Sequence, residues 1–275
     1  MGHGSRRQRA LYVYEPENIA TRALAFAYVR DLLRQLVQAS RRVLVGFDFP
    51  YGYPRGFAEA LRLPPDPHGP WHAVWRVLAE RIQDDQRNGN NRFAVASELN
   101  AMCADGSDWF WGCPPKGRTE HLSPTRRPAK ARWRTVEWVL RDLGKQPQET
   151  FKLLGAGSVG SQTLSGIPYV FRLRHDEALA PCSLVWPFEE GSRVTEPREG
   201  PLVLHAEIWP GAVKQDPTLH PIRDAAQVMS LTRWAARMDA AGKLATYLAC
   251  PLERAGTDQE RILREEGWIL GVAPA

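Results

Sequence analysis

The spacing of apolar residues along the chain predicts a series of helices and short strands. In residues 21–38, leucine and valine recur at helical spacing, which predicts an amphipathic helix. Two arginines, an apolar run and a glycine predict a strand over 43–47 that is buried on both faces. By the same criteria we expect helices over 57–61, 71–82, 92–103, 131–143 and 224–241, the last continued by 243–248, and strands over 11–14, 184–187 and 202–208.

Strands interspersed with helices favour the α/β class. We find no internal repeat and no clean linker, so we expect a single domain over residues 1–275. Residues 104–130 are rich in glycine, proline and charge, which predicts a long basic loop within that domain.

Composition excludes several classes of protein. A chain of 275 residues with 43% hydrophobic and 24% charged residues is typical of a globular protein. No apolar run approaches the roughly 20 residues of a membrane span, and no segment resembles a signal peptide. We therefore expect a cytoplasmic protein without a membrane partner. The four cysteines include no Cys-x-x-Cys pair, which argues against a zinc ribbon or a redox motif.

The net charge of +5 permits a polyanionic partner. Basic residues cluster between positions 116 and 134, where they alternate with tryptophan. Such a stretch can follow a phosphate backbone and stack on bases, although a solvated surface is the commoner explanation. The candidate phosphate contacts in this stretch are Arg126, Arg127 and Arg132.

Acidic residues at the ends of predicted elements are the clearest chemical signal. Asp48 and Glu207 each end an apolar strand before a proline, and Asp224 opens a helix. Open α/β folds place their ligands at the carboxyl ends of strands, and Mg²⁺ prefers oxygen ligands. We therefore expect Asp48, Glu207 and Asp224 to bind Mg²⁺ or Mn²⁺, with Glu98 assisting. Helix capping and solvent exposure are the structural alternatives for Asp224 and Glu98.

Two further patterns carry less weight. Glycines at positions 155, 157 and 160 match the G-x-G-x-x-G pattern, but Gly166 and Pro168 are expected to cut the following helix short. We therefore expect a Gly/Ser loop, which can still present N–H groups to phosphate. His68 and His72 are separated by Pro70, so they cannot share a helical face as zinc ligands.

Taken together, these segments resemble an uncharacterised bacterial family described as predicted ribonuclease H-like nucleases. The resemblance covers Gly46-Phe-Asp48-Phe-Pro50-Tyr-Gly52-Tyr-Pro54, Asn90-Asn-Arg92-Phe, Glu98-Leu-Asn100, Gly157-Ser-Val-Gly160-Ser-Gln162-Thr-Leu-Ser-Gly166-Ile-Pro168, Ala206-Glu207-Ile-Trp209-Pro210, Asp224-Ala-Ala-Gln227 and Glu266-Gly-Trp268-Ile-Leu-Gly271. It implies a ribonuclease H-like mixed sheet flanked by helices and a metal-dependent phosphodiesterase or nuclease. The candidate substrate-binding residues on the matched segments are Asn91, Arg92, Ser158 and Gln162.

The chain departs from that family at its start. The family's first strand bears an Asp, whereas no Asp here precedes Asp31, which lies in a predicted helix. We therefore expect weak or absent activity. The alternatives are a non-catalytic module that binds nucleic acid or a nucleotide, and an enzyme of small-molecule cofactor biosynthesis.

Three spatial predictions follow from this interpretation. Asp48 and Glu207 should end neighbouring strands and share a cation. The 88–91 turn and the 155–160 loop should line the same cleft as Asp48. The strand over 11–14 should pair beside 43–47, with a second copy of the chain covering the remaining edge.

Overall fold

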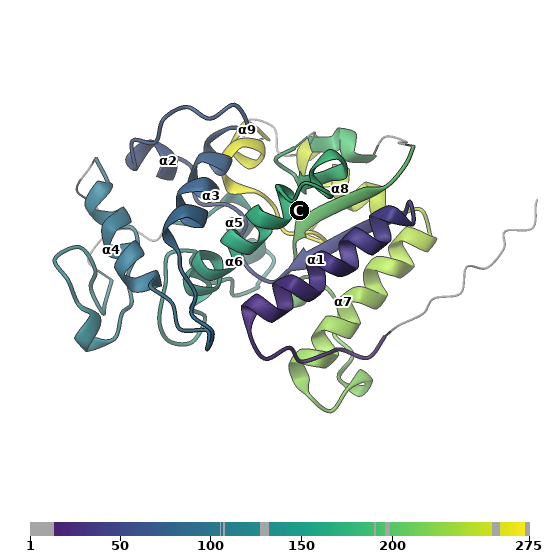
Figure 1. The fold of residues 1–275 in the computed structure, drawn as a ribbon, viewed down its shortest axis with the longest axis horizontal. Helices are drawn as coiled ribbons and strands as arrows, with labels where there is room; N and C mark the ends of the chain where they lie inside the picture. Colours follow the sequence, from purple (N-terminus) through teal and green to yellow (C-terminus); the bar gives the residue numbers. More distant parts are fainter. Residues whose placement is uncertain are drawn as a thin grey trace, which may run out of the picture.

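A small parallel sheet packed against helices lies in one half of the molecule, on the right in Figure 1. The computed structural model describes residues 14–104, 106, 108–126, 132–189, 191–195, 199–254 and 259–272. The helices in these ranges are α1 (Arg22–Gln38), α2 (Phe57–Ala60), α3 (Pro70–Arg81), α4 (Arg92–Met102), α5 (Thr135–Asp142), α6 (Val159–Arg174), α7 (Arg223–Ala240), α8 (Leu244–Arg254) and α9 (Gln259–Arg261).

The sheet has the order β1-β3-β2, and both strand pairs are parallel. The strands are β1 (Arg42–Phe47), β2 (Ser183–Trp186) and β3 (Leu202–Glu207). β3 is buried along its whole length, whereas β1 is only half-buried. The α/β class is confirmed. Two details of the prediction are wrong for the described strands: the sheet is parallel rather than mixed, and the doubly buried central strand is β3 rather than β1.

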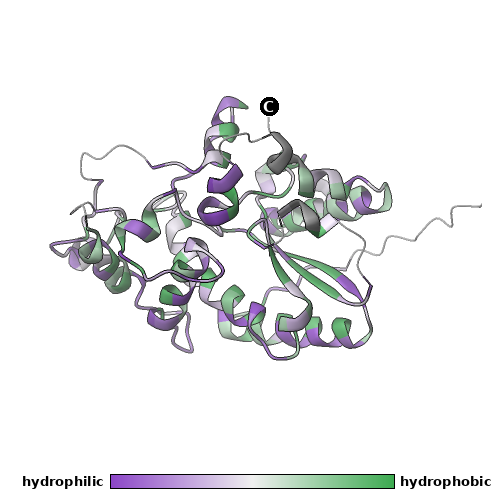
Figure 2. Ribbon diagram, turned by 90° about the horizontal axis from the view of Figure 1, so that it is seen from above, coloured by the Kyte–Doolittle hydropathy of each residue, from purple (hydrophilic) through white to green (hydrophobic). Residues whose placement is uncertain are grey.

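Alternate residues of β1 face different helices, as the pleat of a strand requires. Val43, Val45 and Phe47 pack with side chains of α1 and α6. Leu44 and Gly46 face the opposite side, towards α7 and α8. Figure 2 shows the strands as a hydrophobic layer between helices. On the α7 side the contact is incomplete, because a groove of about 900 Å³ remains between β1 and the helices.

A second core lies beyond the sheet, among α2, α3, α4 and α6. Its centre is a cluster of aromatic rings whose centroids are 4.7–6.0 Å apart. The rings belong to Tyr53, Phe57, Trp109, Phe110 and Phe151. Edge-to-face contacts of this kind add to the free energy gained from burial alone. This core fixes the loops that follow β1.

Helix α6 contradicts the expectation that Gly166 and Pro168 would cut a helix short. It runs unbroken for 16 residues with Pro168 inside it. Proline removes one backbone hydrogen bond, but Pro168 and its neighbours form a buried face that packs against α3. Gly166 allows the ring of Phe49 to lie where a Cβ atom would otherwise project. Tertiary packing therefore outweighs the local propensity.

Most other predicted boundaries are confirmed to within a few residues. The 131–143 helix is shorter than predicted, because α5 begins only at Thr135. Helices α7 and α8 are separate rather than continuous, since Gly242 between them has φ of +69°. The described part of 104–130 is irregular apart from a short 3₁₀ turn, Pro115–Gly117.

The predicted strand over 11–14 falls mostly on residues 11–13, which lie outside the described ranges. Tyr14 is described; it belongs to no strand and is 86% exposed. Within the described part of the chain, no helix is both long enough and apolar enough to cross a membrane.

Candidate functional site

Two of the three predicted acidic residues, Asp48 and Glu207, lie at the carboxyl ends of β1 and β3. The parallel register sets Phe47 opposite Glu207, and Asp48 is the next residue of the chain. Asp224 lies in the first turn of α7, and its charge acts on the carboxyl of Asp48. The prediction that Asp48 and Glu207 end neighbouring strands is confirmed. That they share a cation remains a prediction.

The electrostatics of Asp48 reflect this grouping. The pKa of Asp48 is raised to about 6, mainly by burial of the carboxyl and to a lesser extent by the charges of Glu207 and Asp224. Asp48 as a whole residue keeps contact with solvent, which weakens the effect of both charges. The strand ends therefore carry a local excess of negative charge.

Glu207 is not free to bind a ligand in this structure, because Arg134 holds both of its carboxylate oxygens. The two guanidinium NH groups donate to Oε1 and Oε2, each at 2.7 Å. The backbone N–H of Tyr51 donates a further bond of 2.9 Å to Oε2. Glu207 and Arg134 are 2% and 1% exposed, so the pair is a buried bidentate salt bridge.

Arg134 is the functional residue that sequence reasoning missed. Its side chain also bonds Glu137 at 2.9 Å and the backbone carbonyl of Glu266 at 3.0 Å. Burial alone would lower the pKa of Arg134, but the charges of Glu207 and Glu137 outweigh it, so the pKa is raised. One sequence feature could have drawn attention to Arg134: a glutamate, Glu137, stands three residues later. Its carboxylate accepts a hydrogen bond from the Arg134 backbone N–H, as in a capping box.

Two of the predicted acidic side chains, those of Asp48 and Asp224, are unpaired among the described residues. In the described ranges, Asp48 and Asp224 form no hydrogen bond or ion pair, so their oxygens are available. Mg²⁺ commonly uses one or two carboxylates and completes its shell with water and substrate phosphate. Among the described residues, no group of three or more His, Cys, Asp or Glu side chains could hold a metal. That Asp48 and Asp224 bind Mg²⁺ therefore remains a prediction.

Glu98 does not join this group. It lies on α4, which is far from the sheet in Figure 1, and its side chain is 57% exposed. Its carboxylate pairs with Arg81 at 3.3 Å. Glu98 is therefore better described as a solvent-facing helix residue than as an assisting metal ligand.

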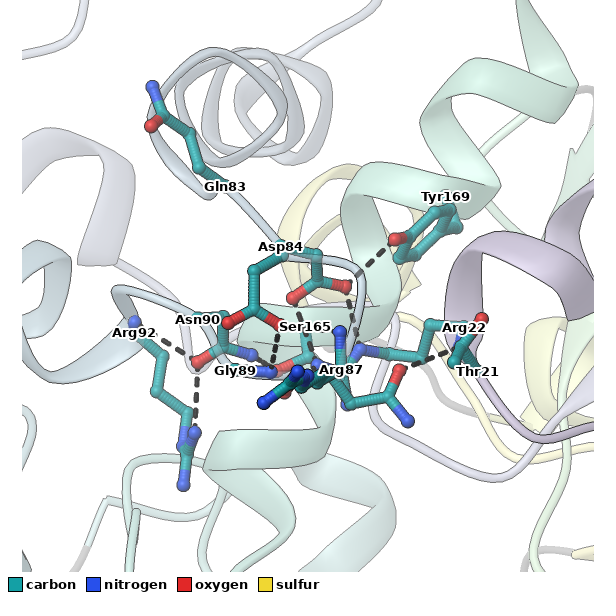
Figure 3. A network of polar contacts seen from close by, with 12 residues as sticks. Thr21, Arg22, Gln83, Asp84, Arg87, Gly89, Asn90, Arg92, Ser165 and Tyr169 are labelled. Carbon is teal, nitrogen blue, oxygen red and sulfur yellow. Dashed lines mark hydrogen bonds and ion pairs between the residues drawn. The ribbon is translucent and has the colours of Figure 1, made fainter.

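A polar network centred on Asp84 joins α1, the 84–90 turn and α6 (Figure 3). Arg22 donates two bonds to the Asp84 carboxylate, at 2.7 and 2.9 Å, and the hydroxyl of Tyr169 donates a third at 2.8 Å. Burial would raise the pKa of Asp84, but these bonds lower it below its usual value. Asn90 ties the turn to α6 through Ser165, at 2.9 Å.

Arg92 extends this network towards the start of α6. Its guanidinium bonds Asn90 Oδ1 at 2.8 Å and Ser161 Oγ at 2.9 Å. Burial and the nearby charge of Arg22 lower its pKa. Asn91 has a structural role, because its side chain bonds the backbone of Gln83 and Arg81.

The other two candidates on this side belong to α6. Ser158 occupies the N-cap position of α6 without a side-chain capping bond. Gln162 lies on the exposed side of the same helix. Ser158 and Gln162 therefore lie near Ser161, which accepts a hydrogen bond from Arg92. Neither of them takes part in that hydrogen bond.

The arginines of the basic loop are largely engaged by the protein itself. Arg126 pairs with Glu149 and lies 4.9 Å from the ring centroid of Trp111. The Arg132 guanidinium lies 3.5 Å from the ring centroid of Trp109. Arg127 lies outside the described residues. These contacts favour a structural role for Arg126 and Arg132 over the predicted binding of phosphate.

A pocket of about 190 Å³ lies between the strand ends and the Asp84 network. Apolar side chains dominate its lining, which also includes Arg22, Phe49 and Tyr169. The 88–91 turn and the 155–160 loop both border α6, but neither lines this pocket. Asp48 does not line this pocket either, so the expectation that the turn and the loop share a cleft with Asp48 remains a prediction.

Comparison with known proteins adds no relative to this picture. No protein-family model, no curated protein and no solved structure matches the chain.

Proposed function

We propose that the chain is a metal-dependent phosphodiesterase of ribonuclease H-like fold that acts on nucleic acid. The observation that supports the proposal is that Asp48 follows β1 at the carboxyl end of a parallel sheet and that the charge of Asp224 acts on it, while neither carboxylate is paired in the described part of the chain. Ligand sites of open α/β sheets lie at this edge. Carboxylates there attract a hard divalent cation, and Mg²⁺ is the commonest of these.

Asp48 and Asp224 would hold the cation. A bound Mg²⁺ supplies Lewis-acid activation of water and charge stabilisation at a phosphate. Arg134 acts as a positioning residue, because it fixes Glu207 and, through the Tyr51 N–H, the turn that follows Asp48. Arg92 is the best candidate for a phosphate contact, since its hydrogen-bond partners are the neutral Asn90 and Ser161.

One observation favours the alternative of a non-catalytic binding module. The salt bridge from Arg134 neutralises Glu207, the strand-end carboxylate that should complete a multi-carboxylate centre. The apolar pocket beside Phe47 and Phe49 offers rings on which a base can stack. In this alternative the chain would bind a nucleotide or single strand without cleaving it.

Metal binding and cleavage, measured separately, test the proposal. We expect purified chain to bind one Mn²⁺, detected by electron paramagnetic resonance, and to cleave labelled oligonucleotides slowly with Mg²⁺ or Mn²⁺. D48N and D224N should each weaken Mn²⁺ binding at least tenfold and abolish cleavage. E98Q is the matched control, because Glu98 is an exposed acid on α4.

Each result distinguishes the candidates. Mn²⁺ binding that is absent, or equal in D48N and E98Q, would contradict the proposal. Binding of metal and oligonucleotide without cleavage would favour the non-catalytic module. Cleavage retained in D48N would show that the acidic centre lies elsewhere.

A further inference from the structure

A second group of ligand-type side chains lies where α3 begins and α6 ends, away from the sheet. His72 stands in the first turn of α3 and is 7% exposed, and His175 follows the last residue of α6. Their Nε2 atoms are 3.2 Å apart, although the residues are 103 positions apart in the chain. The ring of His68, the neighbour that the sequence suggested, lies tilted by 47° against the ring of His72, with centroids 4.6 Å apart.

The outer hydrogen bonds of the two rings fix their tautomers. His72 Nδ1 lies 2.9 Å from a carboxylate oxygen of Asp66, which also pairs with Arg76 and is therefore ionised. His175 Nδ1 lies 2.8 Å from the backbone carbonyl of Phe171. Both of these oxygens only accept hydrogen bonds, so both Nδ1 atoms carry the proton. In the neutral rings, each Nε2 therefore has a lone pair.

Two lone pairs that face each other at 3.2 Å repel unless a cation lies between them. Zinc binds imidazole nitrogen at about 2.0–2.1 Å, and two such nitrogens 3.2 Å apart subtend about 100° at the ion, near the tetrahedral angle. A histidine that gives its other N–H to a carboxylate or carbonyl is the usual arrangement around a bound metal.

We propose that His72 and His175 form a zinc-binding site that bridges α3 and α6, with Asp66 positioning the His72 ring. The described residues offer no third ligand in place, in agreement with the absence of any three-residue metal group among them. His68 is exposed beside the His72 ring, and water can complete the shell of a bound ion. The site is thus open on the solvent side. It is independent of the proposed Mg²⁺ centre, which uses carboxylate oxygens.

The test is calorimetric titration of the tag-free, chelator-treated full chain with ZnCl₂, repeated with Co²⁺ to record its visible absorption. We expect one ion per chain and a rise in melting temperature. H72A and H175A should each weaken binding at least tenfold. D66N should weaken it by about tenfold or more, as loss of an outer carboxylate does elsewhere. H121A is the control, because His121 is an exposed histidine in another part of the chain.

A loss of zinc binding by H175A would not reflect a loss of folding. His175 is exposed, so metal-free H175A should melt at the same temperature as the metal-free parent. Zinc bound as tightly by H72A and H175A as by H121A would overturn the proposal. Absence of zinc binding by the parent chain would also overturn the proposal. A proton shared between the His72 and His175 rings would then explain the short distance between their Nε2 atoms. Unchanged affinity in D66N would overturn the positioning role of Asp66.

Discussion

Among single side chains, we expect loss of Arg134 to lower the free energy of unfolding most. R134M leaves the buried carboxylates of Glu207 and Glu137 without their cation. Breaking a buried pair in this way costs roughly 3–5 kcal/mol, because an uncompensated charge stays in the interior. We expect urea unfolding to show a loss of that size in the free energy of unfolding.

R81M provides the matched control for this variant. Arg81 also pairs with a glutamate, but both side chains are more than one-third exposed. Solvent screens such pairs, so the change should stay within about 1 kcal/mol. Equal destabilisation by R134M and R81M would contradict the view that burial makes the Arg134 pairs important.

At this scale the sequence predicts where the acids lie but not what they contact. Asp48 and Glu207 could be placed from local pattern alone, since each ends an apolar strand before a proline. The partner of Glu207 could not, because Arg134 is 73 positions away and stands in a stretch that looks like solvated surface. A salt bridge between positions far apart in the chain produces no periodic pattern by which one sequence could reveal it.

At the scale of elements, Gly52 allows the turn after β1 to touch the C-terminal segment. A Cβ atom at this position would overlap the backbone carbonyl oxygens of Glu265 and Glu266. Backbone atoms cannot rotate away as a side chain can, so G52A should destabilise the protein by about 3 kcal/mol, measured by urea unfolding. The two segments are also joined by the hydrogen bond from Tyr53 N–H to the Glu265 carbonyl, at 3.1 Å.

G117A is the comparison for this element-level prediction. A Cβ atom there would meet only Pro114 Cδ, at 3.6 Å, and Cys113 Cβ, at 3.8 Å, which are ordinary contacts. Its effect should remain within about 0.5 kcal/mol. A destabilisation of G52A no greater than that of G117A would show that the chain can separate these segments at little cost.

Elements with strong periodicity, such as α1 and α7, were predictable, and α6 was not. Its Gly166 and Pro168 locally oppose a helix, yet the contact with α3 and the ring of Phe49 require one. The same limit applies to the sheet. Apolar content does not reveal whether β1 or β3 is central, because that depends on strand order.

At the scale of the whole molecule, His205 links stability to pH. It is fully buried on β3, with Nε2 2.8 Å from Ser183 Oγ, and burial lowers its pKa from 6.5 to about 3. Between these values the unfolded chain binds a proton that the folded chain does not. This contribution is therefore fully present above pH 6.5 and is lost as pH falls towards 3. At pH 5 the loss should be about 2 kcal/mol relative to pH 7.5.

The variant H205Q separates the pH-dependent stability contribution of His205 from that of the carboxylates, which titrate in the same pH range. The variant is expected to be less stable at every pH, but the difference between parent and variant should shrink by about 2 kcal/mol from pH 7.5 to 5. Urea unfolding at both pH values measures it. A difference that does not change with pH would mean that His205 titrates equally in both states.

The outer edge of β1, which pairs with no strand among the described residues, also belongs to this scale. The expectation that a second copy of the chain covers it remains a prediction, which sedimentation equilibrium over a range of concentrations would test.

The pairing of β1 with β3 has a consequence for synthesis of the chain. Each β1 residue pairs with a residue 160 positions later. At a translation rate of about 5–20 residues per second, β1 leaves the ribosome roughly 10–30 s before its only partner strand in the described sheet exists. During that interval its apolar residues and backbone groups have α1 but no strand to contact. Nascent chains stalled before position 202 should therefore recruit chaperones, and chains stalled well after position 207 should release them.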